Sequence, residues 1–287
     1  MFKNGKVLLA TDFSKTAEML SECLLELKKT GIEEVLLVHV INYRKSAGSV
    51  IELKKNYEEK LADVKKKVEK MGLDASVRVE IGHPHDEIMN IAQEENCQLI
   101  LIASHGRGVV KQIFLGSTTY NVVRKSNIPV LVEKYKNIDR DDCQIACENK
   151  FDRVLLPIDF SDCAQEVLDM VKKMHYTSEE IILVSIIESS EDLEELDAKK
   201  EKARNKLKDI SKELKENNIS NQISIEVRDG AASHNIIEVA EEKDAGLIIM
   251  SKRGTGYLKG LLIGSTADRV TRESPVPVML VPCNKSE

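Results

Sequence analysis

The chain contains two copies of one pattern. KVLLATDFS near the start returns as RVLLPIDFS, EEVLLVHVI returns as EEIILVSII, and IPVLV returns as VPVML. The lag is 147 residues between Asp12 and Asp159 and 148 residues between Gly116 and Gly264. A lag that stays this constant over half a chain indicates a duplication, so the sequence predicts two domains of the same fold.

The length of the chain agrees with a duplicated domain. A chain of 287 residues is too long for one ordinary core. We expect a first domain over residues 1–135, a linker over residues 136–150 and a second domain over residues 151–287. The linker, KNIDRDDCQIACENK, is polar and charged and has no apolar periodicity.

Strands and helices alternate within each copy. Residues 35–40 are apolar almost without a break, which is typical of a parallel strand covered by helices on both faces. Residues 53–71 carry apolar side chains at helical spacing and predict a long helix. The order predicts an α/β fold with two tandem, doubly wound, five-stranded parallel sheets of Rossmann-like type. Further strands are expected at 7–10, 77–81, 99–103 and 129–133, and helices at 85–95 and 118–126.

Apolar stripes identify the helical faces that we expect to be buried. The first stripe follows Ser14, which we expect to cap its helix, as Ser161 does in the second copy. The residues of the three stripes are Ala17, Leu20, Leu24 and Leu27; Leu53, Tyr57, Leu61, Val64, Val68 and Met71; and Leu196, Ala203, Leu207, Ile210 and Leu214.

A loop rich in glycine and hydroxyl residues follows the fourth predicted strand of each copy. The first copy reads ASHGRGVVKQIFLGSTTYNVV, and the second reads SKRGTGYLKGLLIGSTADRV. Glycine lets the backbone approach a ligand closely, and free N–H groups at a helix start bind phosphate. The alternative interpretation is that these glycines only shape turns, but the pattern recurs in both copies. The sequence therefore predicts two phosphate-binding loops.

The motif of phosphoryl-transfer enzymes of the P-loop type is missing, because no GxxxxGK[ST] occurs in the chain. The sequence also shows no Ser-His-Asp arrangement with supporting spacing and no paired carboxylates at a reacting centre. We therefore expect binding with slow hydrolysis of ATP at most. An enzyme with an SGGxDS-type loop after the first strand is disfavoured, because that loop reads ATDFS in one copy and PIDFS in the other.

These motifs resemble the universal stress protein family, in a tandem form that covers nearly the whole chain. Nucleotide-binding members carry G-x-x-G, nine residues, and then G-[ST]. Gly106 with Gly116-Ser117 fits the last part of this pattern, and so does Gly254 with Gly264-Ser265. The chain departs at the first glycine of the motif, where it has Ala103 in one copy and Ser251 in the other.

The resemblance implies a function, partners and a set of site residues. The sheets would be of the adenine-nucleotide α-hydrolase-like type and related by a pseudo-twofold axis, with the two domains paired within the chain and a homodimer expected. The protein would bind ATP or AMP, with Mg²⁺ or Mn²⁺ accompanying a triphosphate, in a stress response or in regulation. Asp12 and Asp159 would face the ribose or the adenine, and the backbone of Val40 and Ile186 would bond the adenine edge. The phosphates and ribose would be held by Gly106, Gly116, Ser117 and Thr118, and by Gly254, Gly264, Ser265 and Thr266.

Several alternatives stay open at this point. Asp12 and Asp159 could instead complement a helix dipole. His39, His83, His85 and His105 could hold a metal, although the other copy has only His234 nearby. A protein-interaction module of the same fold that binds no nucleotide would keep these loops only as relics of an ancestral site.

The Lys252-Arg253 pair stands before Gly254, and positive charge beside phosphates would give the second copy a preference for ligands with more phosphates. The alternative is a pair of solvated side chains.

Composition excludes several classes of protein. The net charge is −6, which disfavours a nucleic-acid binder that works through a basic field. The sequence contains no run of about 18 apolar residues, so it predicts no membrane span. The first residues enter a strand without the apolar core of a signal peptide, so we expect a cytoplasmic protein. The six cysteines are scattered without a CxxC motif, and we expect reduced thiols.

Overall fold

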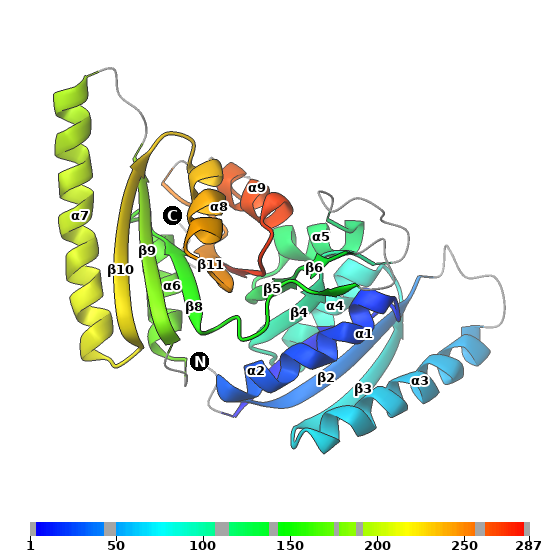
Figure 1. Cartoon of the computed structure of the whole chain (residues 1–287). Coiled ribbons are helices and arrows are strands. Elements are labelled where there is room, and N and C mark those ends of the chain that lie inside the picture. Colours follow the sequence, from blue (N-terminus) through cyan, green and yellow to red (C-terminus); the bar gives the residue numbers. More distant parts are fainter. Residues whose placement is uncertain are drawn as a thin grey trace. The chain divides into compact units, whose positions relative to one another are not determined.

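The computed structural model shows two compact units, Met1–Ile145 and Ala146–Glu287 (Figure 1). Their boundary falls within the segment predicted as a linker, where β6 (Tyr135–Lys136) and β7 (Gln144–Ile145) pair in antiparallel fashion. The residues that the structure describes are 4–42, 50–106, 115–137, 143–174, 178–187, 192–255 and 262–283.

The first unit has a five-stranded parallel sheet in the order β3-β2-β1-β4-β5. The strand order reverses direction between β1 and β4, so this is the doubly wound arrangement that the sequence predicts. Helices α1, α2 and α3 cover one face, and α4 packs beside α5 on the other (Figure 1). The elements are β1 Gly5–Ala10, α1 Lys15–Met19, α2 Leu24–Lys29, β2 Ile32–Ile41, α3 Val50–Lys70, β3 Asp74–Ile81, α4 Pro84–Glu94, β4 Leu99–Ala103, α5 Ser117–Lys125 and β5 Val130–Glu133.

The second unit repeats this topology with strand order β10-β9-β8-β11-β12, again parallel throughout. Helix α7 packs on β9 and β10, and α8 packs beside α9. The predicted fold class is therefore confirmed in both units. The elements are β8 Arg153–Pro157, α6 Asp162–Lys172, β9 Ser178–Ile187, α7 Leu193–Glu216, β10 Ser220–Asp229, α8 Ala232–Glu242, β11 Leu247–Ser251, α9 Ser265–Glu273 and β12 Val278–Val281.

The first predicted apolar stripe is buried, but its helix is interrupted. Ala17, Leu20, Leu24 and Leu27 are all buried, as the spacing predicts. A 3₁₀ turn over Leu20–Cys23 separates α1 from α2. Apolar spacing of three and four residues fits both helix types, so the sequence could not reveal the break.

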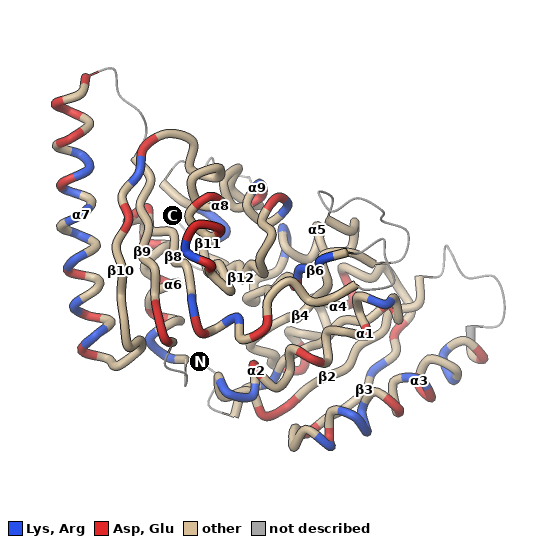
Figure 2. Tube along the Cα trace, viewed as in Figure 1, with Lys and Arg blue, Asp and Glu red and all other residues tan. Residues whose placement is uncertain are grey.

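The long helices α3 and α7 occupy corresponding places and bury corresponding residues. Leu61 and Leu207 are fully buried, 146 residues apart, and β2 and β9 begin at the same lag. Positive and negative residues alternate along the outer faces of both helices (Figure 2). The lag of 146 residues therefore aligns the two units without a gap from the start of β2 to the start of β3.

One pair of cysteines differs from the expectation of reduced thiols. Cys163, near the start of α6, forms a disulfide with Cys283, just after β12. The expectation is wrong for this pair because the fold brings the two Cα atoms to 5.1 Å, although 120 residues separate them in the sequence. Cys23, Cys97, Cys143 and Cys147 are free thiols.

No helix within the described ranges is both long enough and apolar enough to span a bilayer.

We expect Leu207→Ala to lower the free energy of unfolding by about 2–5 kcal/mol, because it leaves a cavity beneath α7. Leu193→Ala in the same helix is the matched control, because that side chain is 73% exposed. Chemical denaturation of both variants measures the difference. Equal stabilities would show that α7 does not seal this core.

Reduction of the Cys163–Cys283 disulfide is expected to destabilise the second unit by about 2–4 kcal/mol, because the bond closes a long loop in the unfolded chain. Thermal denaturation with and without a reductant measures the change. Cys163→Ser should melt at the lower temperature both with and without the reductant. A melting temperature of the wild-type protein that does not change with the reductant would contradict the disulfide.

Candidate functional site

The candidate site of each unit lies at the carboxyl edge of its sheet. Asp12 follows β1, Val40 lies near the end of β2, and Gly106 follows β4. Parallel strands that run in one direction bring these ends to the same edge, where ligands of doubly wound sheets bind. Asp159 and Gly254 occupy the equivalent places after β8 and β11.

A glycine lies against a carboxylate in both units. A Cβ atom added to Gly106 would lie 2.5 Å from Oδ2 of Asp12, so a side chain at this position would force the carboxylate to move. A Cβ atom added to Gly254 would meet Oδ2 of Asp159 in the same way. The lack of a side chain at both glycines therefore leaves room for each carboxylate where it lies, and each unit brings two of its predicted site residues together.

The carboxylates also organise the loops that carry them. Oδ1 of Asp12 accepts a hydrogen bond from the backbone N–H of Ser14 at 2.9 Å, and Oδ1 of Asp159 accepts one from the N–H of Ser161 at 3.1 Å. Oδ2 of Asp159 also accepts from the N–H of Thr255 at 2.9 Å, which ties the loop after β8 to the loop after β11.

The two predicted serine caps are confirmed. The side chain of Ser14 accepts from the N–H of Ala17, and that of Ser161 accepts from the N–H of Ala164. The first helix of each unit, α1 or α6, is thus capped at its N-terminus by the serine that precedes it.

The helices α5 and α9 begin differently. Gly116 and Gly264 hold their N-cap positions, and within the described ranges no side chain caps either helix. The N–H of Gly116 donates to the carbonyl of Ser104, and the N–H of Gly264 donates to that of Lys252, both at 2.8 Å. The first-turn amides that follow these glycines therefore have neither a capping side chain nor the helical partner that later residues have.

The hydroxyl residues predicted to bind phosphate lie in this first turn. Ser117 and Ser265 are exposed, and Thr118 and Thr266 are half-buried. A Cβ atom on Gly116 would lie 3.7 Å from the backbone nitrogen of Gly106, so the two loop glycines are neighbours. The first unit thereby brings Asp12, Gly106, Gly116 and the start of α5 together.

Val40 and Ile186 present backbone rather than side-chain groups. The carbonyl of Val38 accepts from the N–H of Thr11, and the ladder between β1 and β2 reaches no further than Ala10 and Val38. Backbone groups two residues apart in a strand point the same way, so those of Val40 point past the end of β1. In the second unit the N–H of Ile158 donates to the carbonyl of Val184, and the backbone groups of Ile186, two residues further on, therefore point past the end of β8.

A phenylalanine that sequence reasoning missed follows each aspartate. Phe13 has a φ of 58° and Phe160 a φ of 60°, in the left-handed region that bulky residues rarely adopt. The same strained geometry in both units places an aromatic ring beside the site. The signal was present in the sequence, because both repeats read Asp-Phe-Ser.

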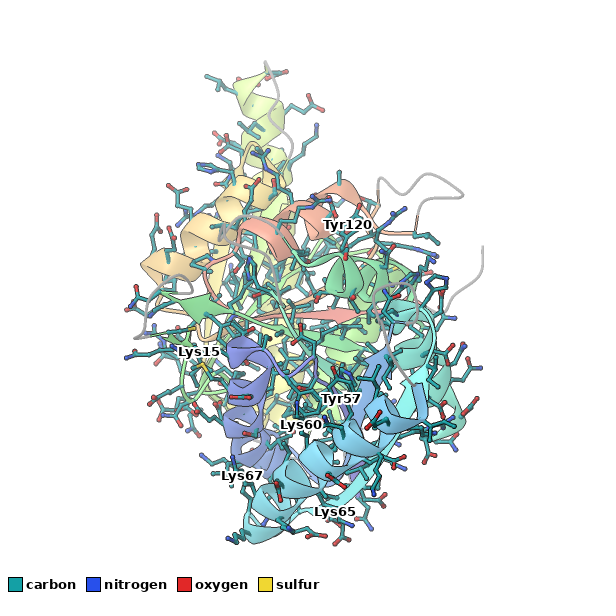
Figure 3. The ribbon with its side chains drawn as sticks, turned by 90° about the vertical axis from the view of Figure 1, so that its right-hand side faces the viewer. Lys15, Tyr57, Lys60, Lys65, Lys67 and Tyr120 are labelled. Atoms are coloured by element: carbon teal, nitrogen blue, oxygen red, sulfur yellow. A yellow bond between two sulfur atoms is a disulfide. The ribbon has the colours of Figure 1, made fainter. Side chains whose placement is uncertain are left out.

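An aromatic cluster surrounds this ring in the first unit. Tyr57 of α3 stacks on Phe13 with ring centroids 5.4 Å apart, and His39 lies 4.1 Å from Tyr57. The ammonium of Lys60 lies 5.7 Å from the centroid of Phe13 and 5.3 Å from that of Tyr57. Figure 3 shows Tyr57 and Lys60 on α3.

Lys252 is not the solvated side chain of the alternative interpretation. Its side chain is only 4% exposed, and burial together with the positive charge of Arg253 lowers its pKa to about 7. Lys252 therefore holds its proton less firmly than an exposed lysine does. Arg253 is half-buried.

The histidines considered for a metal have other partners. Nδ1 of His39 lies 2.8 Å from the carbonyl oxygen of Thr11, and Nδ1 of His105 lies 2.9 Å from Oγ of Ser104. The pKa of His85 is lowered, mainly by burial. Across the described ranges, no three His, Cys, Asp or Glu side chains gather as metal ligands would.

Comparison with curated proteins gives relatives that match single units of the chain. Universal stress protein MJ0577 of Methanocaldococcus jannaschii is 37% identical over 155 residues, which span 46% of this chain and 96% of that protein. Universal stress protein MJ0531 of the same organism is 30% identical over 152 residues, which span 49% of this chain and 87% of the relative.

A solved structure matches the whole chain. A universal stress protein from Archaeoglobus fulgidus superposes with a TM-score of 0.71 and 28% identity, covering 100% of this chain and 99% of its own. The family model described as "Universal stress protein family" matches residues 3–134 and again residues 150–282. The chain therefore belongs to the universal stress protein family and carries two of its domains in tandem.

Proposed function

We propose that each unit binds an adenine nucleotide and that the protein acts in a stress response or in regulation through that binding. The carrying observation is repeated in both units: α5 and α9 each begin at a glycine without a capping side chain among the described residues, and another glycine lies against an aspartate at the same edge of the sheet. A helix start of this kind stabilises an anion through its N–H groups and its dipole.

The ligand would be oriented by its two ends. The phosphates would bind the first-turn amides and the hydroxyls of Ser117 and Thr118, and in the second unit those of Ser265 and Thr266. The backbone groups of Val40 and Ile186 would bond the edge of the adenine, because they point past the neighbouring strand. Asp12 and Asp159 would hold the loop and face the ribose.

A triphosphate would bring Mg²⁺ or Mn²⁺ with it, bound chiefly by its own phosphate oxygens. Hydrolysis is expected to be slow at most. A homodimer and a cytoplasmic location remain predictions.

Calorimetry with ATP and AMP tests this function. We expect dissociation constants on the order of micromolar, equivalent to about −8 kcal/mol. Protein that is purified and then denatured should also release an adenine nucleotide, which mass spectrometry identifies. Failure to detect either would leave a protein-interaction module of this fold as the function.

We expect Gly116→Ala together with Gly264→Ala to weaken ATP binding about tenfold without loss of stability. Among the residues that the structure describes, a Cβ atom at Gly116 would have no neighbour nearer than 3.6 Å and one at Gly264 none nearer than 3.4 Å, so this part of the fold accepts alanine. A side chain there would hold a phosphate away from the amides. Calorimetry and thermal denaturation measure the two effects. Unchanged ATP affinity would show that these glycines serve no ligand.

Arg253→Gln is expected to weaken ATP binding more than AMP binding in the second unit, by roughly tenfold in their ratio, because a charge beside the phosphates contributes more to a triphosphate. Titration of the variant with both nucleotides measures the ratio. An equal loss of affinity for ATP and AMP would show that Arg253 shapes the loop and does not contact the additional phosphates.

A further inference from the structure

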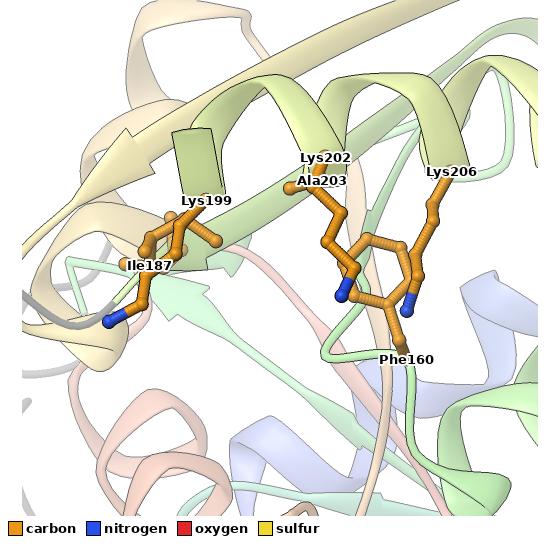
Figure 4. A pocket seen from close by; sticks show the side chains of 7 residues that line it. Phe160, Ile187, Lys199, Lys202, Ala203 and Lys206 are labelled. Atoms are coloured by element: carbon orange, nitrogen blue, oxygen red, sulfur yellow. The ribbon is translucent and has the colours of Figure 1, made fainter. Parts of the chain in front are cut away.

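A cavity of about 310 Å³ lies beside the candidate site of the second unit. Phe160, Ile186 and Ile187 form its apolar part, and α7 contributes Ala203 and three lysines (Figure 4). Its volume is at the lower end of the range for small-molecule pockets. Because Phe160 and Ile186 flank the place proposed for the adenine, the cavity adjoins the base end of the nucleotide.

The three lysines give this cavity a positive rim. Lys199, Lys202 and Lys206 are all exposed and follow one another along one side of α7. Lys199 pairs with Glu195 at 2.8 Å, and the ammonium of Lys206 lies 4.7 Å from the centroid of Phe160. Lys202 forms no ion pair with any residue that the structure describes. An apolar floor with a cationic rim suits a base that has an anionic group beside it in the same ligand.

The first unit has filled the corresponding space. The lag of 146 residues places Tyr57 at the position of Ala203, and the ring of Tyr57 stacks on Phe13. His39 stands where the second unit has Ser185, and it also contacts Tyr57. The smaller residues of the second unit leave its cavity open beside Phe160.

The charge differs as well as the space. Leu53 and Asn56 stand at the positions of Lys199 and Lys202, and only the third lysine has a counterpart, Lys60. The first unit therefore offers one ammonium group where the second offers three.

We propose that the cavity of the second unit binds a second anionic group of its nucleotide, one that lies outside the 5′-phosphate chain. This inference rests on the proposed function, because the helix entrance of α9 holds the 5′-phosphates while the lysines of α7 bind the other charge. The second unit then selects a nucleotide with two separate anionic groups, and the first unit does not.

Calorimetry of the full chain with AMP and with adenosine 3′,5′-bisphosphate tests the proposal. One site per chain should bind the bisphosphate about tenfold more tightly than AMP, the gain expected from ion pairs with exposed lysines. Lys199→Leu with Lys202→Asn copies the first unit and should bring that ratio close to one. Ala203→Tyr places the ring of the first unit in the cavity and should weaken the bisphosphate more than AMP at this site.

The matched control is Lys208→Asn with Lys212→Asn, which removes the same charge from exposed positions of α7 that do not line the cavity. This control should keep the wild-type ratio. Equal binding of AMP and bisphosphate by the wild type, or a ratio that survives Lys199→Leu with Lys202→Asn, overturns the second-anion site alone. No binding of either ligand to the wild type overturns the proposed nucleotide function and this inference with it.

Discussion

The contact between a glycine and an aspartate at the edge of each sheet fixes the rest of the site. Gly106 and Gly254 approach Asp12 and Asp159 so closely that a side chain at either glycine would displace the carboxylate. Because the aspartate lies in the loop after the first strand and the glycine follows the fourth, the contact joins the two loops at the point where the strand order reverses. In the first unit Gly116, the N-cap residue of α5, lies beside this junction.

The fold followed from the sequence because its signals are redundant. Apolar strands, amphipathic helices and serine caps recur in both copies, and each of these local signals agrees with a parallel sheet. The nearly constant lag between the two copies mattered most, since it identified the shared Asp, Gly and Ser positions that the structure brings to one edge of the sheet in each unit. The break between α1 and α2 was missed because apolar spacing alone cannot distinguish a 3₁₀ turn from an α-helix.

Features that depend on contacts over long distances in the sequence could not be predicted. Nothing in the spacing of the cysteines pairs Cys163 with Cys283, since only the folded unit brings them together. The stacking of Tyr57 on Phe13 joins a helix to a loop whose backbone is in an unusual conformation. The sequence left Lys252 open between a charge beside phosphates and a solvated side chain, and its burial depends on packing that the loop sequence does not reveal.

The exchange of Tyr57 for Ala203 between the units shows what fusion of two copies permits. When identical subunits assemble, each substitution appears in every copy, so a residue that closes one site closes all of them. A chain that contains both copies is released from that symmetry, because each half mutates on its own. One half can give up an opening in return for a rigid aromatic stack, while the other keeps the opening and acquires a new specificity.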